Sequence, residues 1–109
     1  MKMNDYQKRA RKTAMYLGVR SQHIVYPALG LAGESGEVCE KVKKWLRGDY
    51  IELVDGSAHS RAAHILSHNK LSDKLEKELG DVLWYIANLA TDLGLDLDDI
   101  ATKNIDKLR

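Results

Sequence analysis

The chain has 109 residues, of which 44% are hydrophobic and 30% charged, and its formal net charge is +1. This length allows one domain, and the near-neutral charge argues against a dedicated nucleic-acid binder. No apolar run approaches the roughly 20 residues of a membrane span, no signal-peptide block is present, and the single Cys39 cannot form an internal disulfide. We therefore expect a cytoplasmic domain over residues 1–109, with no membrane partner.

The composition favours helices over strands, because Leu, Ala, Lys and Glu are frequent and only one Pro occurs. Apolar residues at helical spacing predict a first helix over residues 3–17, which Gly18 would end. A second helix is expected over residues 27–47, with Pro27 in its first turn and Gly48 directly after its end. The class that we predict is all-α.

The first predicted helix carries a cluster of positive charge. Lys8, Arg9, Arg11 and Lys12 lie on it, and Arg20 follows. A helical dimer that binds nucleic acid through these side chains is therefore the non-enzyme alternative. No base-reading motif accompanies them, so we do not expect nucleic acid to be the partner.

Residues 49–70 break the helical pattern and are expected to form an insert. They include a turn signal at residues 55–57 and a weak helical run over residues 61–67. Three of the four histidines fall here, and two of them stand four residues apart, a spacing that can bind zinc: His59, His64 and His68. No Cys or acidic partner stands at a matching distance, so a mobile insert that could fold over an active site is favoured over a zinc site.

A third helix is predicted over residues 72–93, with Ser72 as N-cap and Gly94 after its end. It is apolar on two sides, and one small domain can hardly cover both, so a homo-oligomer, dimer or tetramer, is expected. A fourth helix should begin after the N-cap Asp96 and run to the C-terminus. The expected architecture is a four-helix-type bundle.

Two acidic pairs stand out within the second and third helices. Glu34 and Glu37 are three residues apart, as are Glu78 and Asp81, so the members of each pair share one helix face. Both pairs border apolar stripes of helices that should pack together. Four converging carboxylates would repel each other unless cations lay between them, and oxygen-only ligands favour Mg²⁺, with Mn²⁺ as a substitute.

A di-iron carboxylate bundle is the competing kind of metal site. It requires a His three residues after a ligating Glu. Glu40 stands at that distance from Glu37, and Asp81 at that distance from Glu78, so no imidazole is correctly placed. Oxygen-only coordination is therefore favoured.

The stretch from Leu29 to Val38, with its E-S-G-E step, and the later E-L-G-D-V-L-W-Y stretch of residues 78–85 resemble the MazG-like nucleotide pyrophosphohydrolases, the all-α nucleoside triphosphate pyrophosphatases. The resemblance covers residues 26–48 and 71–109. It implies that Glu34, Glu37, Glu78 and Asp81 bind Mg²⁺, which would bind the triphosphate and lower the pKa of an attacking water.

The same resemblance implies a reaction and a set of substrate contacts. A nucleoside triphosphate, ribo or deoxy, would be cleaved between its α and β phosphates, as a house-cleaning reaction of the nucleotide pool. Glu37 is the best candidate for the base that orients water, although the sequence does not single out one acid. Lys103 and Asn104 resemble the family's polar closing segment, which approaches the substrate. Three further candidate substrate contacts follow from their positions on the predicted helices, with packing or solvation as their alternative role: Tyr85, Lys44 and Trp45.

One departure from the family affects the substrate pocket. The spacer between the two acidic pairs is longer than is usual in the family, and the excess is the insert at residues 49–70. Phosphoribosyl-ATP pyrophosphatases and dimeric dUTPases share the acidic layout, so both remain alternatives for the enzyme.

Overall fold

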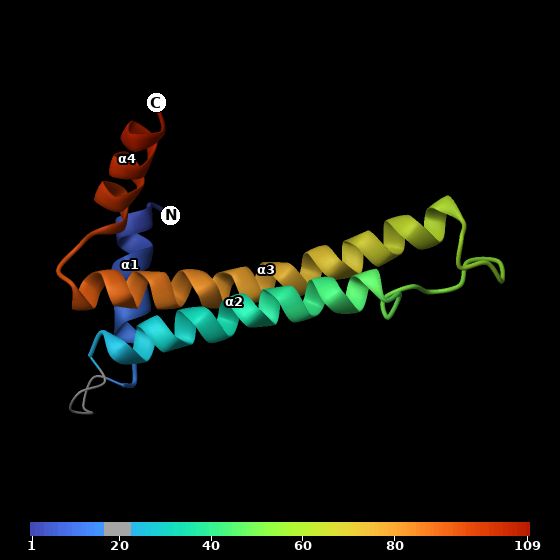
Figure 1. Cartoon of the computed structure of the whole chain (residues 1–109), viewed down its shortest axis with the longest axis horizontal. Helices are drawn as coiled ribbons and strands as arrows, with labels where there is room; N and C mark the ends of the chain where they lie inside the picture. The colour runs from blue at the N-terminus through green and yellow to red at the C-terminus, as the bar shows by residue number, and fades with distance from the viewer. Residues whose placement is uncertain (17–22) are drawn as a thin grey trace. The chain divides into compact units, whose positions relative to one another are not determined.

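The computed structural model of the chain describes residues 1–16 and 23–109. Within them are four α-helices, coloured in chain order in Figure 1: α1 (Met3–Lys12), α2 (Val25–Leu46), α3 (Arg61–Asp92) and α4 (Leu97–Leu108). The described residues form no strand, and Val54 and Ser57 make only an isolated bridge. The predicted all-α class is confirmed. In the described part of the chain, no helix is both long and apolar enough to span a bilayer.

Helix α1 ends at Lys12, so the predicted end at residue 17 is wrong. The hydroxyl of Thr13 donates to the carbonyl of Ala10 at 2.7 Å and accepts a hydrogen bond from Nε1 of Trp84 at 2.7 Å. A Thr hydroxyl that bonds back to the preceding turn competes with continuation of the helix. Gly18, the predicted stop, lies outside the described residues.

Helix α3 begins at Arg61, so the predicted start at Ser72 is wrong. The N-terminal side-chain cap is Ser60, whose Oγ accepts a hydrogen bond from the backbone N–H of Ala63 at 3.0 Å. No Gly or Pro lies between Arg61 and Ser72 to interrupt the helix once it is capped. The second half of the predicted insert is therefore the first three turns of α3.

The other predicted helix ends agree with the structure to within two residues. Gly48 and Gly94 follow α2 and α3 with φ angles of +90° and +71°, a left-handed conformation that glycine adopts at little cost. At the start of α4, the side chain of Asp96 accepts a hydrogen bond from the N–H of Asp99 at 2.7 Å. The predicted N-cap is confirmed.

The chain divides into two compact units, which we call the terminal unit (Met1–Ala32 with Val82–Arg109) and the hairpin unit (Gly33–Asp81). The core of the terminal unit is formed by small and aliphatic residues of α1, α3 and α4, against which three larger side chains pack: Ala10, Ala87, Ala90 and Leu97, with Tyr6, Trp84 and Ile86. Helix α1 thus packs against one of the two apolar sides that the sequence predicts for α3. Oligomerisation stays a prediction.

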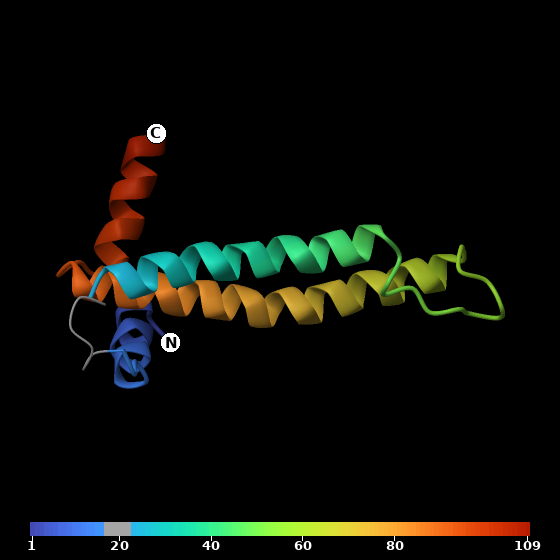
Figure 2. The ribbon, with the colours of Figure 1, turned by 60° about the horizontal axis from the view of Figure 1, so that its bottom comes forward.

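In the hairpin unit, the C-terminal part of α2 and the N-terminal part of α3 run antiparallel and side by side, as Figures 1 and 2 both show. Residues 47–60 connect them without regular helix. Four side chains of this unit are buried: Tyr50, Ala63, Ser67 and Leu71. Both acidic pairs belong to this unit, so their geometry can be described within a single compact body.

Candidate metal centre

Three of the four predicted acids converge in the hairpin unit. Glu34 comes from α2, and Glu78 and Asp81 come from α3. Each offers one carboxylate oxygen, and these three oxygens all lie within 4.8 Å of one another. The i, i+3 spacing on α3 places Glu78 and Asp81 on one face, and the antiparallel packing of α2 brings Glu34 against them. Among the described residues, this is the group of His, Cys, Asp and Glu side chains that could hold a metal ion.

The carboxyl of Glu34 is affected both by burial and by the acids around it. Burial raises the pKa of the Glu34 carboxyl, and the hydrogen bond with Glu78 and the negative charges of Asp81, Glu78 and Glu37 raise that pKa further. A raised pKa is expected for a carboxylate whose negative charge is poorly compensated. Glu34 and Glu78 are half-buried, and Asp81 is exposed. A cation at this position would remove the repulsion while remaining open to solvent on the Asp81 side.

The donor set fits a hard divalent cation. All three groups offer oxygen, and Mg²⁺ in proteins is held by one or two carboxylates together with water or substrate phosphates. No His or Cys belongs to the group, so the soft or borderline metals have no preferred ligand there. The expectation of oxygen-only coordination therefore agrees with the side chains that the fold brings together.

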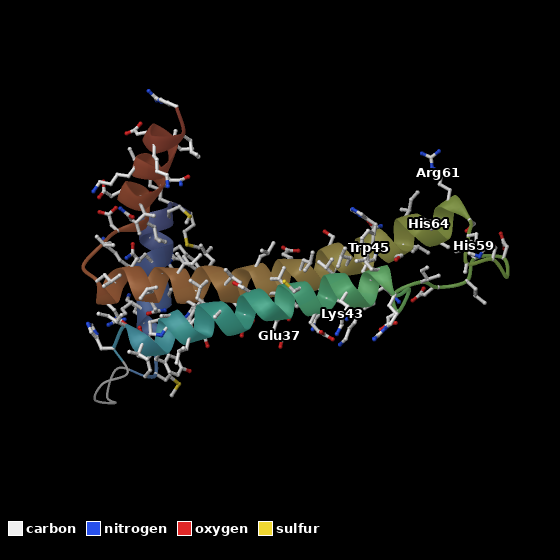
Figure 3. All side chains as sticks on the ribbon, viewed as in Figure 1. Glu37, Lys43, Trp45, His59, Arg61 and His64 are labelled. Atoms are coloured by element: carbon white, nitrogen blue, oxygen red, sulfur yellow. The ribbon has the colours of Figure 1, made fainter. Side chains whose placement is uncertain are left out.

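Glu37 lies outside this group of three. Its Oε2 is 3.8 Å from Nζ of Lys41, one turn further along α2, and the same Nζ is 3.7 Å from Oε1 of Glu78. Figure 3 labels Glu37 on α2. Lys41 therefore links Glu37 to Glu78, one of the three converging acids. The signal for this contact in the sequence is the i, i+4 spacing of Glu37 and Lys41, which is typical of ion pairs on a helix.

Tyr85 is held by packing within the terminal unit. Its ring meets Trp84 edge-on, with ring centroids 5.0 Å apart, and lies 6.2 Å from the ring of Tyr26, which in turn stacks on Tyr16 at 4.8 Å. The packing role that the sequence analysis left open is thus present. A contact of Tyr85 with substrate stays a prediction.

Trp45 and Lys44 lie toward the end of α2, in the hairpin unit. Trp45 lines a pocket of about 200 Å³ together with His64 and Ser67 of α3, and Figure 3 shows Trp45 and His64 close together beyond Glu37. With a rise of 1.5 Å per residue, Trp45 stands about 12 Å along the helix axis from Glu37. Lys44 is half-buried. Their roles as substrate contacts also stay predictions.

Lys103 and Asn104 lie on α4, in the terminal unit, and both are exposed. Nζ of Lys103 is 3.0 Å from a carboxylate oxygen of Asp99, one turn earlier on the same helix. An exposed ion pair of this kind is weak and leaves the ammonium group available to an anion. The predicted approach of these two side chains to substrate is not tested by this arrangement.

The positive charge of α1 is partly engaged inside the terminal unit. Nη1 of Arg11 lies 2.7 Å from Oδ1 of Asp92, whose side chain is fully buried. The hydroxyl of Tyr16 and the backbone N–H of Ile24 donate to Oδ2 of Asp92, at 3.0 and 2.9 Å. Arg11 is therefore not a free contact for nucleic acid, and Arg20 lies outside the described residues. This network leaves no signal in the sequence, because its members are separated by many residues.

The fold and the acid group together define an all-α protein in which two antiparallel helices bring together three carboxylates that could hold a metal ion. Its family follows from comparison with known sequences. The profile of the MazG nucleotide pyrophosphohydrolase domain matches residues 26–109, and the chain belongs to this family.

Among curated proteins, the chain is similar to one from Mycobacterium phage L5 named Gene 37 protein. The two are 37% identical over 113 aligned positions, which cover 100% of this chain and 87% of the phage protein. No solved structure matches the chain significantly. The resemblance inferred from the two acidic pairs is thus confirmed at the level of the family.

Proposed function

We propose that the chain is a Mg²⁺-dependent nucleoside triphosphate pyrophosphohydrolase that converts (d)NTP to (d)NMP and pyrophosphate and so cleans the nucleotide pool. The observation that carries the proposal is the convergence of Glu34, Glu78 and Asp81 from two helices. Family membership supports the class of reaction, and the three converging acids support the hairpin unit as its proposed location.

Glu34, Glu78 and Asp81 would hold Mg²⁺, or Mn²⁺ in its place. When bound, the ion neutralises negative charge on the phosphates and makes phosphorus more electrophilic. The remaining acid, Glu37, is 53% exposed at its side chain and does not belong to the group of three, so it is accessible to a water molecule. We assign it the role of general base.

The reaction balances with one water molecule. Glu37 takes a proton from this water while the water oxygen forms a bond to the α phosphorus. The bond between the α phosphorus and the oxygen that bridges to the β phosphorus breaks, and pyrophosphate leaves. The ammonium groups of Lys44 and Lys103 and the amide of Asn104 are proposed substrate contacts, and Tyr85 and Trp45 are proposed to pack against the nucleoside.

We further propose that the working form is a homodimer or homotetramer in the cytoplasm. Several large apolar side chains of α2 and α3 are exposed, among them Leu29, Leu46 and Leu79, and a second copy would bury such residues. The lone Cys39 is a free, exposed thiol, which is typical of proteins from a reducing compartment.

The test is pyrophosphate release from a panel of ribo- and deoxynucleoside triphosphates, canonical and modified, that includes dUTP and phosphoribosyl-ATP. We expect release to require Mg²⁺ and to fall at least about a hundredfold in Glu37→Gln and Asp81→Asn. Glu40→Gln is the matched control, because Glu40 is also on α2 but pairs with Lys43 at 2.9 Å. Release that persists in the site variants, or that never occurs with any substrate, would reject the hydrolase.

A further inference from the structure

Among the described residues, Lys41 is the basic residue that forms ion pairs with the predicted metal ligands. Its Nζ lies 3.7 Å from Oε1 of Glu78 and 3.8 Å from Oε2 of Glu37. The Lys41 side chain is 21% exposed and that of Glu78 17% exposed, so the charges are only partly screened by water. Lys43, two positions further along α2, is 63% exposed and pairs with Glu40 instead.

The charges around Lys41 are unbalanced. The four acids outnumber the positive charges near them, and the Lys41 ammonium offsets one unit of their negative charge. Glu78 belongs both to the group of three acids and to the Lys41 pair. A divalent cation bound by the three acids and the ammonium of Lys41 would therefore draw on the same carboxylate. Two positive charges that share one carboxylate weaken each other's binding.

The two distances also indicate that Lys41 can yield. Both exceed the 2.7–2.9 Å that is typical of a charge-assisted hydrogen bond, so the attraction is Coulombic rather than tightly directional. A Lys ammonium is a compact charge on a flexible stem of four carbons and can follow a neighbouring carboxylate. Lys41 could thus give up Glu78 and stay with Glu37.

We propose that Lys41 is a built-in counter-cation of the acidic site, which competes with the divalent ion for Glu78. In the metal-free chain, its ammonium offsets the repulsion between Glu37 and Glu78. When the three acids take up a divalent ion, Lys41 is displaced from Glu78 and remains paired with Glu37. Lys41 is thus a positioning residue that sets the metal affinity, and this inference rests on the proposed function.

The test is Mn²⁺ binding to the chain without nucleotide. Binding is measured as the decrease of the free-Mn²⁺ signal in electron paramagnetic resonance. We expect Lys41→Met to bind Mn²⁺ about three- to tenfold more tightly than wild type, because a positive charge near 4 Å from the shared carboxylate is removed. Lys41→Arg, which keeps the charge, should stay close to wild type. Lys43→Met is the matched control and should also stay close to wild type.

A double-mutant cycle tests the shared carboxylate directly. Glu78→Gln should weaken Mn²⁺ binding, and adding Lys41→Met to it should tighten binding clearly less than in wild type, because the residue for which the two cations compete is gone. Circular dichroism of each variant separates these effects from unfolding.

The outcomes separate this inference from the proposed function. Unchanged or weaker Mn²⁺ binding in Lys41→Met, or equal tightening in Lys43→Met, would overturn the role of Lys41 while leaving the hydrolase untouched. The predicted tightening in a chain that hydrolyses no nucleotide would support Lys41 and reject the hydrolase. A wild-type chain that binds no Mn²⁺ would overturn both.

Discussion

The aromatic ring of Tyr85 occupies the space that a side chain at position 30 would need. A Cβ built on Gly30 would clash with Cε1 of Tyr85 and would lie 2.5 Å from its Cδ1. The absence of a side chain at position 30 therefore allows α2 and α3 to approach closely within the terminal unit. Gly30 thus serves helix packing.

Gly30→Ala should destabilise the fold, because the added methyl group cannot be accommodated without moving the Tyr85 ring. We expect the free energy of unfolding to fall by about 1–3 kcal/mol, as for overpacked cores. Gly33→Ala is the control, since a Cβ there would meet nothing within 4 Å. It should stabilise by up to about 1 kcal/mol through helix propensity. Urea unfolding followed by circular dichroism measures both, and equal effects would contradict the packing role.

Asp92 should make the fold sensitive to acid. Burial by itself raises the pKa of Asp92, but the hydrogen bonds from Ile24, Arg11 and Tyr16 favour the carboxylate by more, so the pKa lies below its ordinary value of 3.8. In the unfolded chain the group keeps the ordinary pKa and therefore binds more protons near pH 3–4. The stability that Asp92 contributes is thus complete above about pH 4 and is lost as the pH falls through the folded-state pKa.

Asp92→Asn should remove that part of the acid sensitivity and lower the free energy of unfolding at pH 7 by about 1–3 kcal/mol, because Arg11 loses its buried partner. Asp49→Asn is the control: its pKa is also lowered, by the hydrogen bond with Arg47, but the pair is exposed. It should change stability little. Unfolding curves recorded between pH 2 and pH 7 would decide, and a pH profile that Asp92→Asn leaves unaltered would disprove the assignment.

Ser60 should hold the first turn of α3 in place. Ser60→Ala removes the acceptor for the N–H of Ala63 and should cost about 1 kcal/mol. Ser72→Ala provides the contrast, because Ser72 lies inside the helix, where Ala is the better helix former. It should leave stability unchanged or raise it. Hydrogen exchange of residues 61–66 should accelerate in the first variant alone, and the reverse pattern would place the start of the helix at Ser72.

Glu34→Gln should affect the melting temperature in opposite ways with and without Mg²⁺. Without metal, the variant loses one of three repelling charges, and we expect its melting temperature to rise by about 1–3 °C. With Mg²⁺, the wild-type chain should gain stability in proportion to the logarithm of the ion concentration, whereas the variant should gain clearly less. Differential scanning calorimetry across a Mg²⁺ series checks both directions. A wild-type melting temperature that is indifferent to Mg²⁺ would contradict the site.

The sequence determined the features that depend on neighbouring residues. The helix caps at Gly48, Gly94 and Asp96 were predictable because each reflects the local backbone preference of one residue. The pairing of acids within each helix was predictable because i, i+3 spacing is set by the helix itself. The family followed from the same two acidic steps.

Only the tertiary structure decided which side chains meet across helices. It brought Glu34 to Glu78 and Asp81 while leaving Glu37 with Lys41, although the sequence offered four equivalent acids. It also covered the second face of α3 with α1. These outcomes depend on how each helix is rotated about its axis when the apolar stripes pack. The hydrophobic periodicity of the sequence fixes this rotation only to within a few tens of degrees. A difference of that size decides whether a carboxylate joins the cluster or faces water.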